Sequence, residues 1–282
     1  MEVRKINEKL PLENFMAITS YLHEILVFLK KKKIISPEKT KSIFEIGEQN
    51  WYGDVSLKDL IKTINNYSDS KNKEVLCKKI NEIISLIEKG TDPRNFAFDV
   101  AKLFYRAIFD YEEYKALDLQ GTKQSINFDL NNEYRDVKRY DVVTNIGTSE
   151  HIFNQLAVFK TIHNLVTTEG IIIHQLPGQG YYDHGFYNYQ PTFFFDLAQA
   201  NNYLIVGFWM YDNNKRELIN VHKRENYVKL FKKENHPTYY DNIVVYKSSS
   251  EKNKEFKLPT QYIYSEKNLS SEEKKLWDEN KK

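Results

Sequence analysis

Two histidines beside acidic or glycine-rich stretches are the residues of this chain best suited to proton transfer. His151 follows Glu150 just after a strand-like run, and His184 lies in a loop rich in glycine and aromatic residues. Because histidine titrates near neutral pH, either residue could act as a general base on a substrate hydroxyl. The alternative is structural: Glu150 caps a helix, and each histidine packs within its loop. The sequence leaves open which histidine, if either, acts as the base.

Three strand-like runs end in acidic, small or polar residues that could hold a ligand. In an open α/β sheet, the ligand crevice lies at the carboxyl ends of the strands. Three such ends therefore suggest one nucleotide-like ligand. The runs, with their residues of interest, are Lys41–Asn50 with Glu45 and Gly47, Tyr114–Gly121 with Asp118, and Tyr140–His151 with Asn145.

Each of these strand-end residues has a chemical role and a structural alternative. The Glu45 carboxylate would favour the ammonium group of a ligand in a low-dielectric crevice, or it forms a loop salt bridge. Gly47 would let the backbone approach the ligand closely, or it is an ordinary turn glycine. Asp118 would accept hydrogen bonds from two ribose hydroxyls, or it caps its strand. Asp129, after the next strand, contacts the ligand or forms an Asx turn.

A second group of candidate residues follows a later strand-like run. The segment HGFYNYQP, His184–Pro191, comes after a strand end, where substrate loops commonly lie. Its aromatic rings could form a wall for a sugar or a planar substrate, or they form a packed loop. The histidines from His151 to His222 raise the question of a metal site. No pair has the spacing of ligands one helical turn apart and the chain has one cysteine, so we predict no metal.

Hydrophobic spacing predicts the elements that position these residues. Apolar residues at helical spacing predict an N-terminal helix over 12–32, which Pro37 separates from the first strand. The segment between the first and second strands is mostly helical and long for one crossover, so we assign an insertion to about 52–91. Further helices are expected over Leu57–Asn65, Lys73–Lys89, Arg94–Tyr111, Gln155–Val166 and Pro191–Ala200. Strands after the first are expected over Lys115–Leu119, Ser125–Leu130, Asp141–Asn145, Gly170–Gln175, Tyr203–Met210 and Tyr239–Lys247.

This order of elements predicts an α/β fold with a mostly parallel, seven-stranded sheet and helices on both faces. We expect an N-terminal helical extension over 1–40, an α/β domain over 41–247 and a polar C-terminal tail over 248–282. Because the predicted crevice lies at the strand ends, the N-terminal helix and the insertion would shape or cover it.

The composition is that of an ordinary globular protein. The 282 residues are 41% hydrophobic and 28% charged, and the net charge of +2 gives no argument for a nucleic-acid partner. The one cysteine, Cys77, allows no internal disulfide and fits a reducing compartment. We find no signal peptide and no run that would span a bilayer, so we expect a cytoplasmic protein without membrane contact.

The order of the strand ends resembles that of the class I S-adenosylmethionine-dependent methyltransferases, over roughly residues 42–247. The segment EIGEQN, Glu45–Asn50, stands where this family has an acidic-x-Gly-x-Gly motif. NIGTSEH, Asn145–His151, resembles the stretch after the family's fourth strand, and GIIIHQLPGQG, Gly170–Gly180, resembles the strand that ends beside the substrate. The resemblance implies a Rossmann-like fold and S-adenosylmethionine as cofactor.

The resemblance also implies roles for individual residues. Asp118 stands where an acidic residue of the family holds the ribose hydroxyls, and Asp129 where a residue accepts a hydrogen bond from the adenine amino group. Gln49 departs from the pattern, because it stands at the second glycine position and would crowd the methionine part of the ligand unless the turn is reshaped. The implied cofactor-binding residues are Glu45, Gly47, Gln49, Asp118, Leu119, Asp129, Leu130, Asn145 and Glu150.

Methyl transfer is an in-line displacement that mainly requires a well-placed acceptor. The resemblance therefore implies a methyltransferase that acts on a hydroxyl or amine of a small-molecule or saccharide-like substrate. His151 and His184 are the candidate catalytic residues. The sequence leaves open the acceptor and whether the protein forms a homodimer.

Two other functions compete with this one. The first is a degenerate methyltransferase fold that acts as a non-catalytic protein-interaction module. It predicts that side chains such as Gln49 and Trp51 plug the crevice, whereas an enzyme would have Glu45, Gly47 and Asp118 lining an open one. The second is a nicotinamide-dependent oxidoreductase, which is disfavoured because no G-x-G-x-x-G follows the first strand.

Overall fold

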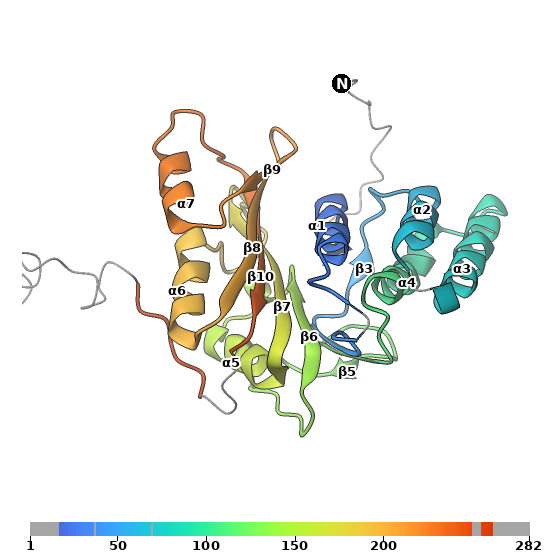
Figure 1. The fold of residues 1–282 in the computed structure, drawn as a ribbon, viewed down its shortest axis with the longest axis horizontal. Coiled ribbons are helices and arrows are strands. Elements are labelled where there is room, and N and C mark those ends of the chain that lie inside the picture. Colours follow the sequence, from blue (N-terminus) through green and yellow to red (C-terminus); the bar gives the residue numbers. More distant parts are fainter. Residues whose placement is uncertain (1–16, 37, 69, 250–254, 262–282) are drawn as a thin grey trace, which may run out of the picture.

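One large sheet runs through the middle of the molecule, and helices cover both of its faces (Figure 1). The computed structural model describes residues 17–36, 38–68, 70–249 and 255–261. The start of the predicted N-terminal helix, 12–16, and most of the predicted tail lie outside these residues. Within the described part, none of the helices combines the length and the apolar character that a membrane span needs.

The large sheet has eight strands within the described residues. They are β2 (Ser42–Ile46), β4 (Glu113–Asp118), β5 (Ile126–Asn127), β6 (Tyr140–Ile146), β7 (Val166–Gln179), β8 (Leu204–Asp212), β9 (Glu217–Asn220) and β10 (Tyr240–Lys247). Their order across the sheet is β5-β4-β2-β6-β7-β10-β8-β9. From β5 to β7 the strands pair in parallel, whereas β10 runs antiparallel between β7 and β8, and β9 runs antiparallel to β8. The predicted mostly parallel α/β sheet is confirmed.

Successive residues of the central strands enter two different hydrophobic cores, one on each face of the sheet. Ile43 of β2 and Val142 of β6 belong to the first core, and the next residues, Phe44 and Val143, belong to the second. Because both faces are covered, these strands read as continuous apolar runs, which is why the sequence identified them.

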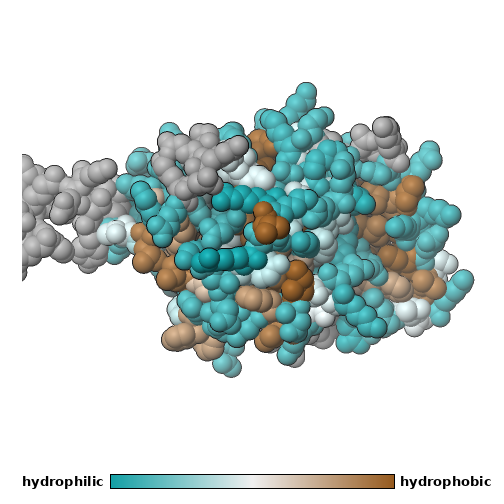
Figure 2. Space-filling view, turned by 90° about the horizontal axis from the view of Figure 1, so that it is seen from below, coloured by the Kyte–Doolittle hydropathy of each residue, from teal (hydrophilic) through white to brown (hydrophobic). Residues whose placement is uncertain are grey.

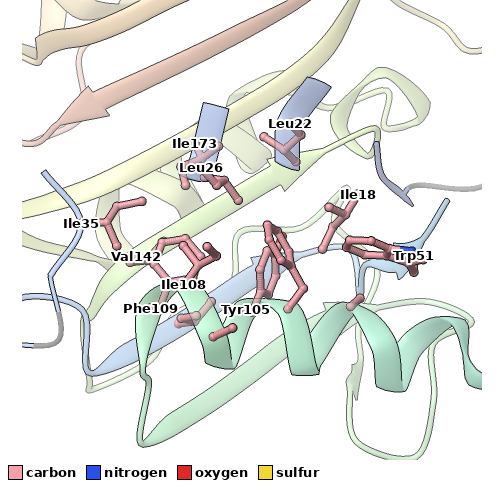
Figure 3. Close-up of a cluster of buried hydrophobic side chains, with 14 of the residues drawn as sticks. Ile18, Leu22, Leu26, Ile35, Trp51, Tyr105, Ile108, Phe109, Val142 and Ile173 are labelled. Carbon is pink, nitrogen blue, oxygen red and sulfur yellow. The ribbon is translucent and has the colours of Figure 1, made fainter. Parts of the chain in front are cut away.

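The helices divide between the two faces (Figure 1). Their bounds are α1 (Ser20–Lys31), α2 (Leu57–Tyr67), α3 (Ser70–Glu88), α4 (Ala97–Phe109), α5 (Gln155–Leu165), α6 (Pro191–Asn201) and α7 (Arg224–Phe231), with short 3₁₀ turns η1 (Pro93–Phe96) and η2 (Ser149–His151). Helices α1 to α4 lie on one side, and α5 to α7 lie on the other. Figure 3 shows Leu22 and Leu26 of α1 beside Val142 and Ile173 of the sheet, with Ile108 of α4 in the same cluster.

Helix α1 begins at Ser20, later than the predicted start at residue 12. Thr19 has an extended backbone, and its hydroxyl accepts a hydrogen bond from the Leu22 backbone N–H, so it caps the helix. The preceding strand β1 (Ala17–Ile18) pairs in parallel with β3 (Asn50–Trp51). This small second sheet holds the N-terminal segment against the loop that follows β2.

Strand β9 and helix α7 were not predicted. Every residue of α7 retains some exposure, and β9 is a half-exposed edge strand, so neither has the apolar run that marks the central elements. Strand β5 is also shorter than the predicted Ser125–Leu130. In the described part of the tail, the Lys257 backbone exchanges two hydrogen bonds with the Asn201 side chain. The division into extension, domain and tail stays a prediction.

The face of the molecule shown in Figure 2 is mainly hydrophilic, with hydrophobic residues in separate groups. Scattered apolar residues are ordinary on a protein surface. This face therefore does not indicate a large protein interface.

Candidate active site

A cavity of about 2200 Å³ opens at the carboxyl ends of the parallel strands. Its wall includes Asp118 at the end of β4, Gly147 just after β6 and Gln175 in β7. The start of α1, the segment before α4 and the loop after β7 contribute the rest of the wall. This is the position at which ligands bind in open α/β sheets, and at which the sequence analysis placed the ligand.

The predicted site residues divide into two sets. Those in the cavity wall are Asp118, Leu119, Asp129, Leu130, Glu150, His151 and His184. Those that lie behind the wall are Glu45, Gly47, Gln49 and Asn145. Of the second set, Asn145 supports the turn that carries Glu150 and His151, and the other three shape the loop after β2.

Glu45 is buried beneath the loop that follows β2. Its carboxylate accepts hydrogen bonds from the Tyr114 hydroxyl, from the Gln49 backbone N–H at 3.1 Å and from the Thr144 hydroxyl at 3.5 Å. Burial raises the pKa of Glu45 to about 7. Glu45 lies behind the cavity wall, so a contact with the ammonium group of a ligand would require the loop to move. In the described geometry, Glu45 supports the loop instead.

Gln49 fills the space that a second glycine would leave empty. It is almost fully buried, and its side-chain amide donates to the Gly47 carbonyl at 3.1 Å and to the Ile146 carbonyl at 2.9 Å. These bonds tie the loop after β2 to the end of β6. Gly47 has a φ of 81°, a left-handed conformation that favours glycine. The turn is therefore reshaped around the Gln49 side chain.

Glu48 was not predicted, yet it joins three segments at this edge of the sheet. Its buried carboxylate accepts hydrogen bonds from Lys102 Nζ at 2.6 Å and from the Thr122 backbone N–H and hydroxyl at 2.6 and 2.8 Å. Its own backbone N–H donates to Asp118 at 2.9 Å. A Cβ added at Gly121 would lie 2.8 Å from the Glu48 carboxylate, so the turn needs glycine there. Glu48 thus fixes the position of Asp118.

Asp118 and Leu119 present a polar and an apolar surface next to each other in the cavity wall. One Asp118 oxygen accepts the Glu48 N–H, and the other accepts the Gln120 N–H at 2.7 Å. Each carboxylate oxygen has two acceptor positions, so both oxygens retain one for a ligand hydroxyl. The Leu119 side chain is 58% exposed and offers apolar surface to a planar group.

Asp129 forms the Asx turn that the sequence analysis gave as its structural alternative. One of its carboxylate oxygens accepts hydrogen bonds from the backbone and the side chain of Asn131, both at 2.9 Å. Leu130, the next residue, is buried in the second core and also reaches the cavity wall. Asp129 still has acceptor positions for a ligand, so the turn and a ligand contact are compatible.

Asn145 is fully buried and positions the turn that carries Glu150. Its side-chain amide donates to the Ser149 hydroxyl at 3.0 Å and lies 3.2 Å from Nδ1 of His174. Burial lowers the pKa of His174 to about 3, so this histidine is neutral. Asn145 therefore does not line the cavity. It affects the site by holding the backbone turn that carries Glu150.

Glu150, His151 and His184 come together at the cavity wall. One Glu150 oxygen lies 3.6 Å from Nε2 of His184 and 3.9 Å from Nε2 of His151. Glu150 is fully buried, and neither of its oxygens has a hydrogen-bond partner among the described residues. The nearby Glu150 carboxylate raises the pKa of His184. The fold thus joins two histidines that the sequence analysis proposed from separate stretches.

The loop that carries His184 packs directly on the backbone of Glu150. The Glu150 carbonyl accepts hydrogen bonds from the Phe186 N–H at 2.8 Å and from the Tyr187 N–H at 3.2 Å. A Cβ added at Gly185 would lie 2.9 Å from that carbonyl oxygen. The close approach of the two backbones therefore holds His184 beside Glu150.

We expect Gly185→Ala to lower the free energy of unfolding by about 1–3 kcal/mol, because the added methyl group forces the two backbones apart. Urea unfolding followed by circular dichroism measures this difference. Tyr182→Ala is the matched control, since Tyr182 lies in the same loop and is largely exposed. Equal stability of Gly185→Ala and the unsubstituted protein would show that the loop does not need this close approach.

A second polar cluster lines the cavity near β10. Asp241 is buried and accepts hydrogen bonds from the Tyr181 hydroxyl at 2.6 Å, the Tyr21 hydroxyl at 3.1 Å and the Asn213 amide at 3.0 Å. Burial raises the pKa of Asp241. The Tyr21 ring also stacks on Tyr211, with 4.0 Å between the ring centroids. The sequence analysis missed this cluster because its members come from separate segments of the chain.

A comparison with protein families identifies the family of this chain. A family described as a methyltransferase domain matches residues 58–236, which is more than half of the chain. The chain belongs to this family of S-adenosylmethionine-dependent methyltransferases, and S-adenosylmethionine is its cofactor. The match begins after the Glu45–Asn50 loop, so it does not depend on the motif that first suggested the family. No curated protein matches the chain.

Solved structures of methyltransferases are similar to this chain at low identity. The 1,6-didemethyltoxoflavin N1-methyltransferase of Burkholderia thailandensis, with bound S-adenosylhomocysteine, is 8% identical with a TM-score of 0.42, and the similarity covers 80% of this chain and 78% of that one. An O-methyltransferase from a polyketide synthase multienzyme of Brevibacillus brevis, in complex with S-adenosyl-L-homocysteine, is 12% identical with a TM-score of 0.42, covering 80% of this chain and 72% of that one.

The residues of the cavity fit S-adenosylmethionine at its nucleoside end. Asp118 retains acceptor positions for ribose hydroxyls, and Leu119 exposes apolar surface beside it. Of the three residues expected to line an open crevice in an enzyme, Asp118 lines the cavity, whereas Glu45 and Gly47 lie behind its wall. Gln49 fills the interior of the loop after β2, and Asn50 and Trp51 of that loop line the cavity. The loop is therefore reshaped, and the space for a ligand next to it is open.

Proposed function

We propose that this chain methylates a hydroxyl or amine of a small-molecule or saccharide-like substrate bound in the cavity. The observation that supports this most is the cluster of Glu150, His151 and His184 in the wall of the cavity. Bound S-adenosylmethionine supplies an electrophilic methyl group. The chain then has to place the acceptor atom behind that group and to take up the proton that the acceptor releases.

The proton of the acceptor is proposed to pass to His184 or His151. Both imidazole rings are partly exposed, and both lie near the buried Glu150 carboxylate. The Glu150 carboxylate raises the pKa of His184, which favours the protonated imidazole that forms during the reaction. Glu150 is thus a positioning residue, and which histidine faces the acceptor stays open.

The cofactor contacts are proposed for the predicted residues of the cavity wall. Asp118 accepts the ribose hydroxyls, and Asp129 accepts the adenine amino group. Leu119 and Leu130 provide the apolar surface beside the base. The residues that lie behind the wall act through the loops: Glu45, Gly47 and Gln49 through the loop after β2, and Asn145 through the turn before Glu150.

The saccharide-like substrate is proposed from the aromatic and polar surface near β10. Tyr181, Tyr182, Tyr211 and Tyr239 line the cavity, and Asp241 lies among them. Flat aromatic rings offer apolar faces to a sugar ring or to a planar molecule. A carboxylate accepts hydrogen bonds from the hydroxyl groups of such a substrate. This surface and the Glu150 cluster line one cavity, so a substrate held by the first would reach the second.

Incubation with S-adenosylmethionine that carries a labelled methyl group tests the proposal. The acceptor is supplied as the ultrafiltrate of a cell extract, which contains small molecules only. We expect the label to appear in a small molecule as an O-methyl or N-methyl group. The macromolecules retained from the same extract are supplied in a parallel incubation. Label that enters only these macromolecules, with no transfer to the ultrafiltrate, would contradict a small-molecule substrate.

A further inference from the structure

The three side chains at the cavity wall have the donor set and the spacing of a metal site. One ring nitrogen of His151, one of His184 and a carboxylate oxygen of Glu150 lie within 4.8 Å of one another. Zinc ligands lie about 2.0–2.2 Å from the ion, so two ligands in a tetrahedral arrangement are roughly 3.4 Å apart. The measured separations of 3.6 and 3.9 Å from Glu150 are close to this value. Small rotations of exposed imidazole rings would close the remaining difference.

Glu150 lacks the partners that a buried carboxylate normally has. Its side chain is fully buried, and neither oxygen accepts a hydrogen bond from the described residues. A buried charge without compensation costs several kcal/mol in effective terms, and proteins pair such groups or use them to coordinate metals. The only cationic partners near it among the described residues are the two histidines, which are charged only when protonated. A bound cation would supply the missing charge at neutral pH.

The backbone holds the three ligands in place without a metal ion. His151 follows Glu150 directly in the turn η2, and the loop of His184 is tied to the Glu150 carbonyl through the Phe186 and Tyr187 N–H groups. Sites built on a fixed backbone need little reorganisation when the ion binds. At Gly185 the loop lies so close to the Glu150 backbone that a side chain has no room, and this close packing also holds the loop in place.

All three ligands face the same cavity, which leaves the remaining coordination positions open to it. Two histidines and one carboxylate are a ligand set of catalytic zinc sites, where a water or substrate atom completes the coordination. Imidazole and carboxylate together favour borderline divalent transition metals over magnesium. An oxygen atom of a substrate in the cavity could therefore bind directly to the ion.

We propose that Glu150, His151 and His184 bind a divalent transition-metal ion, with zinc or manganese as the probes, whose open position faces the substrate cavity. No metal was predicted from the sequence, because no histidine pair has the spacing of one helical turn and the chain has one cysteine. This proposal uses the same residues as the proposed methyl transfer, and it is an alternative to proton uptake by the histidines, because an imidazole nitrogen that binds the ion cannot accept a proton there. The occupancy of the site is measurable without substrate or cofactor.

Calorimetric titration of the metal-stripped, untagged protein with Zn²⁺ and with Mn²⁺ tests the proposal. We expect one ion per chain, with an affinity that falls at least about tenfold in Glu150→Gln, His151→Ala and His184→Ala. His222→Ala is the matched control, because His222 does not line the cavity. The bound ion should also raise the thermal unfolding temperature of the unsubstituted protein and not that of the three variants.

Two results would overturn the metal site. One is the absence of stoichiometric binding of either ion, and the other is binding that persists unchanged in Glu150→Gln and His184→Ala. A cooperative thermal unfolding transition of each variant without metal shows that the variant is folded, so a loss of metal binding cannot be due to unfolding.

Titration with S-adenosylhomocysteine in the same variants separates the two proposals. If the protein binds the metal ion but not S-adenosylhomocysteine, the proposed function is contradicted and the metal site is not.

Discussion

His184→Asn should reduce the rate of methyl transfer by about 100- to 10,000-fold, while the affinity for S-adenosylhomocysteine stays unchanged. This range is what a positioned general acid–base group typically contributes. His184 lies 3.6 Å from a buried carboxylate that raises its pKa, so it is better suited to take up a proton than an isolated histidine. Asparagine keeps a polar side chain of similar width and removes the titrating ring.

The measurement is the initial rate of label transfer to the acceptor fraction, alongside calorimetric titration with S-adenosylhomocysteine. His151→Asn, measured in parallel, shows which of the two histidines has the larger effect. His163→Asn is the control outside the cavity wall. An unchanged rate in both His184→Asn and His151→Asn would remove the two histidines from the reaction.

Glu45→Gln should stabilise the protein at pH 8 and change how its stability depends on pH. Burial raises the pKa of Glu45 from its ordinary value of 4.5 to about 7. Below pH 4.5 the group is protonated in the folded and the unfolded chain. Between pH 4.5 and 7 the unfolded chain releases the proton and the folded chain keeps it, so the folded state loses stability as the pH rises. The total loss is about 3 kcal/mol, and it is complete above pH 7.

Glutamine lacks the titrating proton, so the free energies of unfolding of the two proteins should diverge by about 3 kcal/mol between pH 4.5 and pH 8. Other buried groups, such as His174 with its lowered pKa, act equally in both proteins and cancel in the difference. Urea unfolding at several pH values gives this difference, with Glu82→Gln on the exposed side of α3 as control. A difference that does not vary with pH would show that the pKa of Glu45 is the same in the folded and the unfolded chain, and thus that burial does not raise it.

The fold was predictable because its main strands are buried on both faces. The runs around Ile43, Val143 and Ile172 are apolar over several residues, and such runs identify central strands without any knowledge of their neighbours. Strand β9 and helix α7 lack this signal, since their residues are half exposed. Their formation depends on contacts with β8 and α6, which a local pattern does not carry.

The site was predictable only in part, for a related reason. The topology of a parallel sheet brings strand ends together, so Asp118 and Glu150 were found from their positions alone. The hydrogen bonds that hold these residues in place were not predictable in this way. Glu48, for example, binds Lys102 and Thr122, which are far from it in the sequence. The role of Gln49 depends on the carbonyl of Ile146, which is nearly a hundred residues away. Such contacts follow from the fold and leave no mark on the local sequence.

Calorimetric titration of the purified protein with S-adenosylmethionine and S-adenosylhomocysteine tests the central claim most directly. We expect both ligands to bind with a dissociation constant in the micromolar range, and Asp118→Ala to weaken binding at least about tenfold, since it removes hydrogen bonds from hydroxyls to a charged group. Asp99→Ala, on an exposed position of α4, should bind as the unsubstituted protein does. If the folded protein binds neither ligand, the reshaped Gln49 loop has abolished the cofactor site, and the fold serves as a protein-interaction module instead.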